Sequence, residues 1–225
     1  MRELDDGTPL FYVPRSVKLD SVNQWSNNMD IQFPAMCKRR TACSSTEAHQ
    51  MILIPNAEGM SKLDQYVKDD PVIIQEFVQH DGVIVKVYVA DGQINASTRP
   101  SFKNMDATAG DVVHFDSQIL PKSFETEIEL SNDLDRVFLR SDPSDIHLEK
   151  EAILSTVLLQ RIAESLHKQL GLTFFGFDVL LESKSNAYYV VDVNYFPSFK
   201  DVDDFHSKFV DILEKRLGIQ SNQIK

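Results

Sequence analysis

The sequence has few of the features that mark disulfide-rich, zinc-binding or membrane-spanning proteins. Its 225 residues include only two cysteines, Cys37 and Cys43, and the N-terminus has no apolar core of a signal peptide. Two thiols six residues apart form neither a disulfide framework nor a zinc site, and they indicate a reducing compartment. No apolar run approaches the roughly 20 residues that cross a bilayer. We therefore expect a cytoplasmic protein that is not inserted in a membrane.

An excess of positive charge is also missing. The formal net charge of −11 opposes nonspecific binding to nucleic acid and to anionic membranes. The charges are unevenly distributed, because acidic residues concentrate at 125–151 and 201–204, whereas 38–40 and 99–103 are locally basic. A few cations in a cleft can therefore still attract an anionic ligand. There are no internal repeats, and the length suits one domain or two packed lobes, expected as a monomer.

The most informative stretch is FFGFDVLLESKSNAYYVVDVNYFPSF at residues 174–199. Two apolar, β-branched and aromatic runs at 174–181 and 188–193 flank a polar turn, which predicts a β-hairpin. Asp178 interrupts the first run with a carboxylate, and Asp192 and Asn194 place a carboxylate and an amide at the end of the second. Because strand side chains alternate, Asp192 and Asn194 share one face, and Asp178 on the neighbouring strand can reach it.

Two carboxylates and an amide on one apolar surface indicate a bound cation, since unpaired buried charges are costly. All three are hard oxygen ligands, which suit Mg²⁺ and do not suit zinc. Magnesium held by so few protein groups usually completes its coordination with water and phosphates, so the hairpin indicates nucleotide-dependent phosphoryl chemistry. Spacing alone leaves open the alternative that these polar residues only end a strand at the surface.

Two lysines could serve the same chemistry. Lys86 interrupts the apolar strand VIVKVYV, where a charge must either face a polar cleft or be paired. Lys38 stands at the end of another strand, and its neighbours Arg39 and Arg40 leave open a solvated strand end. His80 and His114 receive no functional role.

The remaining pattern predicts strands and helices around the hairpin. Strands are expected at 31–39, 51–54, 72–78, 83–90, 93–98 and 112–115, with a hairpin turn at Asp91-Gly92. Helices are expected at 16–27, 59–67 and 205–217. The longest helix is expected to begin at Pro143, with Asp142 as N-cap, and to stop at Gly171. Residues 104–141 are expected to be mostly loop.

Four stretches together resemble one family. They are QEFVQHDGVIVKVYV at 75–89, TRPSFKN at 98–104, FGFDV at 175–179 and VVDVNYFPSF at 190–199. Their order and spacing are similar to those of the inositol 1,3,4-trisphosphate 5/6-kinases, also called inositol-tetrakisphosphate 1-kinases, from about Phe33 to Leu217. The resemblance implies the ATP-grasp fold, an α/β architecture with antiparallel sheets and helices in two lobes around a nucleotide cleft.

The resemblance also implies ATP and Mg²⁺ as cofactors, an inositol polyphosphate as substrate, and roles for individual residues. The matches to ATP-binding positions are Lys38, Gln75, Glu76, Val78, Lys86, Ser101 and Ser117, of which 75–78 form the hinge that reads adenine through its backbone. The matches to magnesium ligands are Asp178, Asp192 and Asn194. The matches to substrate-binding positions are His49, Lys86, Arg99, Asn194 and Ser198. Lys86 and Asp192 would be the catalytic residues. A lone histidine such as His49 is otherwise more often structural.

The resemblance implies a domain organisation as well. Residues 1–30 would be a leader with a short helix, and 31–225 the catalytic domain, with lobes at 31–78 and 79–225. The family's N-terminal inositol-phosphate-binding domain is expected to be absent. The loop at 42–47 replaces a segment that usually contains glycine, and Ser198 stands where the motif usually has glycine. The motif positions that form the nucleotide cleft are all matched, whereas those that contact the substrate are not.

The expected reaction is in-line transfer of the γ-phosphoryl group of ATP to an inositol phosphate hydroxyl, through positioning and charge neutralisation. No residue stands out as a general base. Two alternatives remain open from the sequence: an ATP-grasp carboxylate-amine ligase, and an inactive nucleotide-binding fragment.

Overall fold

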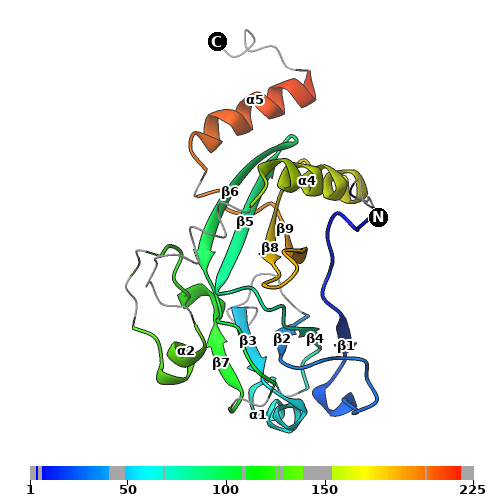
Figure 1. The fold of residues 1–225 in the computed structure, drawn as a ribbon. Helices are drawn as coiled ribbons and strands as arrows, with labels where there is room; N and C mark the ends of the chain where they lie inside the picture. The colour runs from blue at the N-terminus through cyan, green and yellow to red at the C-terminus, as the bar shows by residue number, and fades with distance from the viewer. Residues whose placement is uncertain are drawn as a thin grey trace.

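The computed structural model describes residues 4, 7–40, 49–67, 69–107, 110–124, 126, 129–138, 154–200 and 202–218. Its strands form two antiparallel sheets, drawn one above the other in Figure 1. The five-stranded sheet contains, in spatial order, β1 (Ser16–Leu19), β4 (Val72–Glu76), β2 (Ala35–Arg39), β3 (Gln50–Ile54) and β7 (Val113–Asp116). The four-stranded sheet contains β6 (Gln93–Pro100), β5 (Val83–Ala90), β8 (Phe174–Leu181) and β9 (Tyr188–Tyr195).

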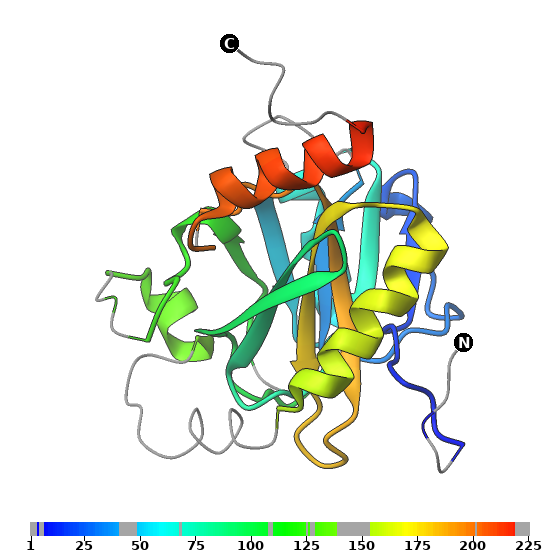
Figure 2. The ribbon, with the colours of Figure 1, turned by 90° about the horizontal axis from the view of Figure 1, so that it is seen from above.

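Helices flank both sheets. The two longest are α4 (Thr156–Leu170) and α5 (Phe205–Leu217), which lie against the four-stranded sheet (Figures 1 and 2). The shorter α-helices are α1 (Asp64–Val67) and α2 (Asn132–Val137), and the 3-10 helices are η1 (Val22–Gln24), η3 (Ala57–Lys62) and η4 (Ser117–Ile119). The predicted α/β architecture of antiparallel sheets and helices is confirmed.

Strand alternation separates the two faces of the four-stranded sheet. In β5, every second residue from Val83 to Val89 is buried, and in β8 the residues Phe175, Phe177 and Val179 face the same way. Val85, Val87 and Val89 of β5 and these three residues of β8 form one core with helix α4, through Leu159, Ile162 and Leu166. Burial of each such side chain contributes about 1.5–3 kcal/mol. The intervening residues of β5 and β8 therefore face away from α4.

Helix α5 packs near the end of the opposite face through aromatic rings. Phe174 of β8 lies 5.1 Å from Phe209 between ring centroids, and Phe199 stacks on Phe205 at 3.9 Å. The last turn of α5 is held by Lys215 and Arg216, which both pair with Asp91 in the β5–β6 turn. In the turn after β9, Phe199 is thereby buried between the sheet and α5.

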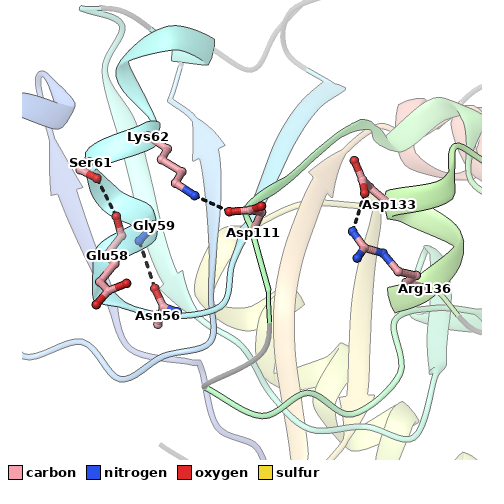
Figure 3. Close-up of polar contacts among 8 residues, drawn as sticks. All are labelled: Asn56, Glu58, Gly59, Ser61, Lys62, Asp111, Asp133 and Arg136. Atoms are coloured by element: carbon pink, nitrogen blue, oxygen red, sulfur yellow. Dashed lines mark hydrogen bonds and ion pairs between the residues drawn. The ribbon is translucent and has the colours of Figure 1, made fainter.

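The 3-10 helix η3 packs closely over the five-stranded sheet. A Cβ atom on Gly59 would come within 2.9 Å of side-chain atoms of both Ile54 and Val112, so this position requires glycine. Asn56 caps η3 by accepting a hydrogen bond from the Gly59 N–H at 3.1 Å, and Lys62 pairs with Asp111 (Figure 3). These contacts anchor the segment that leads into β7. They thereby help to fix the position of Ser117, which directly follows β7.

Most predicted elements are confirmed, including the hairpin of β8 and β9 and the final helix α5. The helix predicted at 16–27 is wrong, because residues 16–19 form β1 and only 22–24 make a helical turn. Leu19 is 1% exposed and pairs with Val72, so sheet pairing prevails over weak helical spacing.

The predicted start of the longest helix at Asp142 and Pro143 lies outside the described residues. Leu154 and Ser155 are not helical, and the Ser155 hydroxyl accepts from the Leu158 N–H as the N-cap of α4. The predicted stop is confirmed, since Gly171 has φ of 68° and its N–H bonds the His167 carbonyl. The stretch expected to be mostly loop contains the short helix α2.

The sheets draw strands from beyond the ranges expected for the lobes. β1 precedes residue 31 and β7 follows residue 78, yet both belong to the five-stranded sheet. Among the helices of the described ranges, none combines the length and apolar character needed to span a bilayer.

Cys37 provides a test of this core. It lies in the middle of the five-stranded sheet with 1% exposure, and burial raises the pKa of its thiol to about 12. Because a raised pKa leaves the neutral thiol dominant at pH 8, Cys37 should not react with Ellman's reagent in native protein. In a Cys43→Ser variant, we expect one thiol to react only after unfolding in denaturant. Reaction of the native variant at the rate of a free thiol would contradict this packing.

Candidate functional site

A cavity of about 370 Å³ lies between the two sheets and is lined from both. It includes every site residue predicted from the sequence except Ser198, which is exposed and outside it. The predicted residues that line it are Lys38, His49, Gln75, Glu76, Val78, Lys86, Arg99, Ser101, Ser117, Asp178, Asp192 and Asn194. The structure therefore brings the candidate residues together at one place.

The two carboxylates meet because of an irregularity in the hairpin. Asp178 pairs directly with Asp192, but Val179 pairs with Val190, so Val191 is an extra residue in β9. Tyr188 and Val190 belong to the core under α4. A regular strand would turn Asp192 toward that core as well. The bulge instead places Asp192 beside Asp178 on the cavity face.

The acidic side chains have partners in this arrangement. The Lys86 ammonium lies 2.7 and 2.6 Å from the two Asp178 oxygens, and the side chains of Lys86 and Asp178 are 27% and 15% exposed. The Asn194 amide donates to Asp192 at 2.9 Å. Burial raises the pKa of Asp178, an effect that Lys86 opposes and Asp192 reinforces.

Lys38 connects the two sheets. Its ammonium, on β2, donates to the Gln75 side-chain oxygen at 2.8 Å and to the Val191 carbonyl at 3.3 Å. Burial lowers the pKa of Lys38, while Asp192 and Asp178 act in the opposite direction. Two lysines and two carboxylates thus form one electrostatic group, whose positive members face the same cavity.

A buried histidine missed by the sequence analysis lies at the other end of the cavity. His80 is 2% exposed, with Nδ1 2.6 Å from the Val78 carbonyl and Nε2 2.8 Å from the Ser101 hydroxyl. A histidine two positions after the hinge segment was the available signal. Nothing in the sequence shows that residue 101 would be its partner.

The walls between these polar ends are largely apolar. The side chains that contribute are Met36, Met51, Phe77, Phe102, Phe115 and Leu180, and Lys122 adds a cation. An apolar cavity with polar groups at both ends suits a ligand with a flat ring and a charged tail.

The chain turns sharply after the carboxylates. Phe196 and Phe199 have φ of 46° and 51°, a region that bulky residues rarely adopt. The aromatic contacts of Phe199 with Phe205 and of Phe196 with Phe209 hold this turn. A Cβ on Gly176, which pairs with Asn194, would lie 3.1 Å from Pro197, so the turn packs directly on β8.

The donor set fits magnesium. Asp178, Asp192 and Asn194 offer carboxylate and amide oxygens from adjacent strands, which Mg²⁺ prefers. Within the described ranges, no three His, Cys, Asp or Glu side chains gather as a metal cluster, so a zinc-type site does not fit there.

Comparisons with known proteins identify related sequences. The family model of the inositol 1,3,4-trisphosphate 5/6-kinase ATP-grasp domain matches residues 6–215. The inositol-tetrakisphosphate 1-kinase of Xenopus laevis is 30% identical over 186 residues, which are 81% of this chain and 41% of that protein. Inositol-tetrakisphosphate 1-kinase 3 of Arabidopsis thaliana is 27% identical over 227 residues, covering 99% and 59%. The chain thus spans about half the length of the curated relatives that it matches.

Solved structures support the fold alone. The macrocyclase MdnC of Microcystis aeruginosa, bound with its precursor peptide, has a TM-score of 0.52 at 12% identity, covering 91% of this chain and 56% of that one. The D-alanine–D-alanine ligase of Bacillus anthracis has a TM-score of 0.50 at 18% identity, covering 93% and 63%.

The ion pair at the centre of the site predicts a specific stability pattern. Lys86→Met leaves Asp178 without its counter-ion, and we expect a loss of about 2–3 kcal/mol at pH 7 in EDTA. Lys86→Met/Asp178→Asn should recover at least half of that loss, because no unpaired charge remains. Urea unfolding of both variants and of Asp178→Asn measures the coupling.

The same variants test the sign of the pKa shift. A carboxyl with a raised folded-state pKa favours the folded protein at low pH and loses this contribution as pH rises. The loss of unfolding free energy in Lys86→Met, relative to the wild type, should therefore shrink as the pH falls from 7 toward 5. Equal deficits in the single and double variants, at both pH values, would contradict the assignment.

Proposed function

The chain belongs to the inositol 1,3,4-trisphosphate 5/6-kinase ATP-grasp family, and from this premise we propose that it is an ATP- and Mg²⁺-dependent kinase that phosphorylates a hydroxyl of an inositol polyphosphate. The observation that carries the proposal is the convergence of Lys38, Lys86, Asp178, Asp192 and Asn194 on one cavity between two sheets. Catalysis would rest on positioning and charge neutralisation.

The carboxylate end of the cavity would hold the phosphates. Mg²⁺ held by Asp178, Asp192 and Asn194 would neutralise charge on the phosphate oxygens. Lys86 already lies against Asp178, and Lys38 points toward the same carboxylates from the opposite sheet. Both ammonium groups would therefore orient the phosphate tail and offset the negative charge that grows during transfer.

The hinge end would hold the nucleoside. Residues 75–78 are the end of β4 and the two residues after it, and the apolar walls of the cavity begin beside them. A purine placed there would be enclosed by Met and Phe side chains while its ribose points toward the lysines. Ser101 and Ser117 line the same cavity and would contact the nucleotide.

The acceptor hydroxyl would approach from the side of Arg99, His49 and Asn194, which also line the cavity. The net charge of −11 does not oppose this, because the cations are directed inward. Ser198 remains a proposed contact outside the cavity. A cytoplasmic location is likewise a proposal, supported by the unpaired Cys37.

The direct test is to incubate the purified chain with Mg-ATP and a panel of inositol tris- and tetrakisphosphates, and to separate the products by charge. We expect one added phosphate on at least one substrate. ADP release with amino acids and none with inositol phosphates would instead favour a ligase. Thermal stabilisation by Mg-ATP without phosphorylation of any substrate would indicate a nucleotide-binding module.

Asp192→Ala tests the metal assignment. Within the described part of the chain, the one hydrogen bond of its side chain is with Asn194, so the fold should persist while turnover falls by about 100-fold or more. Asp133→Ala is a matched control, since it removes an exposed carboxylate on α2 that pairs with Arg136 (Figure 3). Unchanged turnover in Asp192→Ala would refute the metal site.

A further inference from the structure

We propose that His80 is a positioning residue of the cleft, which fixes the Ser101 hydroxyl as a hydrogen-bond acceptor for the nucleoside part of the bound nucleotide. The inference rests on the proposed function, because it concerns the same cavity.

One imidazole connects segments that leave the two sheets. Val78 follows β4 of the five-stranded sheet, and Ser101 follows β6 of the four-stranded sheet. His80 lies between them at 2.6 Å from the Val78 carbonyl and 2.8 Å from the Ser101 hydroxyl. The Ser101 N–H also donates to the Gly82 carbonyl at 2.7 Å, so both the backbone and the side chain of residue 101 are held by hydrogen bonds.

The contact with Val78 determines the direction of the second hydrogen bond. A carbonyl oxygen only accepts, so Nδ1 must carry a proton, and in the neutral imidazole this is the single ring proton. Nε2 is then the acceptor, and the Ser101 hydroxyl donates to it. Ser101 has no second proton, so toward a ligand its oxygen can only accept.

The position of Ser101 identifies which part of a nucleotide it meets. Lys86, the partner of Asp178, faces Ser97 in the β5–β6 register. Ser101 lies four residues farther on, which is roughly 13 Å at about 3.3 Å per residue. It is thus far from the carboxylates and beside the hinge. The donors of a nucleoside at this end are the ribose hydroxyls and the exocyclic amino group.

Four variants separate the two contacts of His80. His80→Asn keeps a donor near the Val78 carbonyl and loses the reach to Ser101. His80→Gln keeps an acceptor near Ser101 and loses the contact with Val78. His80→Leu removes both contacts, and Ser101→Ala removes the hydroxyl. His167→Leu is the control, because His167 makes the same Nδ1 contact with a carbonyl, that of Leu172 at 2.6 Å, outside the cavity.

Calorimetric titration with Mg-ATP measures the dissociation constants. We expect Ser101→Ala, His80→Asn and His80→Leu to bind about tenfold more weakly. His80→Gln should remain within about threefold of the wild type, and His167→Leu within about twofold. Ser101→Ala should add little in the His80→Leu background, since the two residues act together.

Three analogues that each lack one donor test the direction of the bond: 2′-deoxy-ATP, 3′-deoxy-ATP and N6,N6-dimethyl-ATP. One of them should bind the wild type about tenfold more weakly than ATP, and that difference should disappear in Ser101→Ala. If the ratio of each analogue's dissociation constant to that of ATP is the same in the wild type and in Ser101→Ala, the assignment of Ser101 as an acceptor is overturned.

The remaining outcomes also decide the inference. His80→Gln as weak as His80→Leu would overturn the coupling to Ser101, and so would effects of His80 and Ser101 that simply add. If His80→Leu does not fold, the comparison of His80→Asn, His80→Gln and Ser101→Ala decides alone. A wild type that binds no Mg-ATP would refute the proposed function itself, whereas tight binding that is insensitive to His80 would refute only this inference.

Discussion

The structure of the site depends on an ion pair in the middle of a sheet. Lys86 and Asp178 occupy adjacent strands whose other face is packed under α4. Because neither charge can be buried alone without a large cost, the face that carries them cannot be covered by an apolar layer. The sheet therefore has one face for the core and one for polar chemistry. The alternation of side chains along β5 and β8 is enough to separate the apolar face from the polar face.

Several residues of the site make hydrogen bonds that join the two sheets at the cavity. Lys38 reaches from β2 to the Val191 carbonyl of β9, and His80 links Val78 to Ser101. These hydrogen bonds thus connect the two sheets at the same residues that line the cavity. A substitution in this group changes both the connection and the cavity lining. Apolar contacts add to this connection, because Phe102, which follows β6, packs against Phe115 of β7 with ring centroids 5.0 Å apart.

Sequence reasoning succeeded where the local pattern and the tertiary structure agree. The hairpin, the lysine in VIVKVYV and the glycine at the end of α4 follow from alternation and from turn chemistry, and all three are present. It failed where the structure or role of a residue depends on a partner that is distant in the sequence. Residues 16–19 have only a weak pattern of their own and become a strand by pairing with β4. His80 had no visible partner, since Ser101 is distant from it in sequence and adjacent in space.

The sequence by itself determined which residue types share the strands of the site: two carboxylates, an amide and a lysine among β-branched and aromatic residues. Only the tertiary structure decided that they face one another. In a regular strand, Asp192 would lie on the same side as Tyr188 and Val190, under α4. The extra residue Val191 reverses that side, and the free energy of packing Tyr188 and Val190 into the core holds the reversal in place.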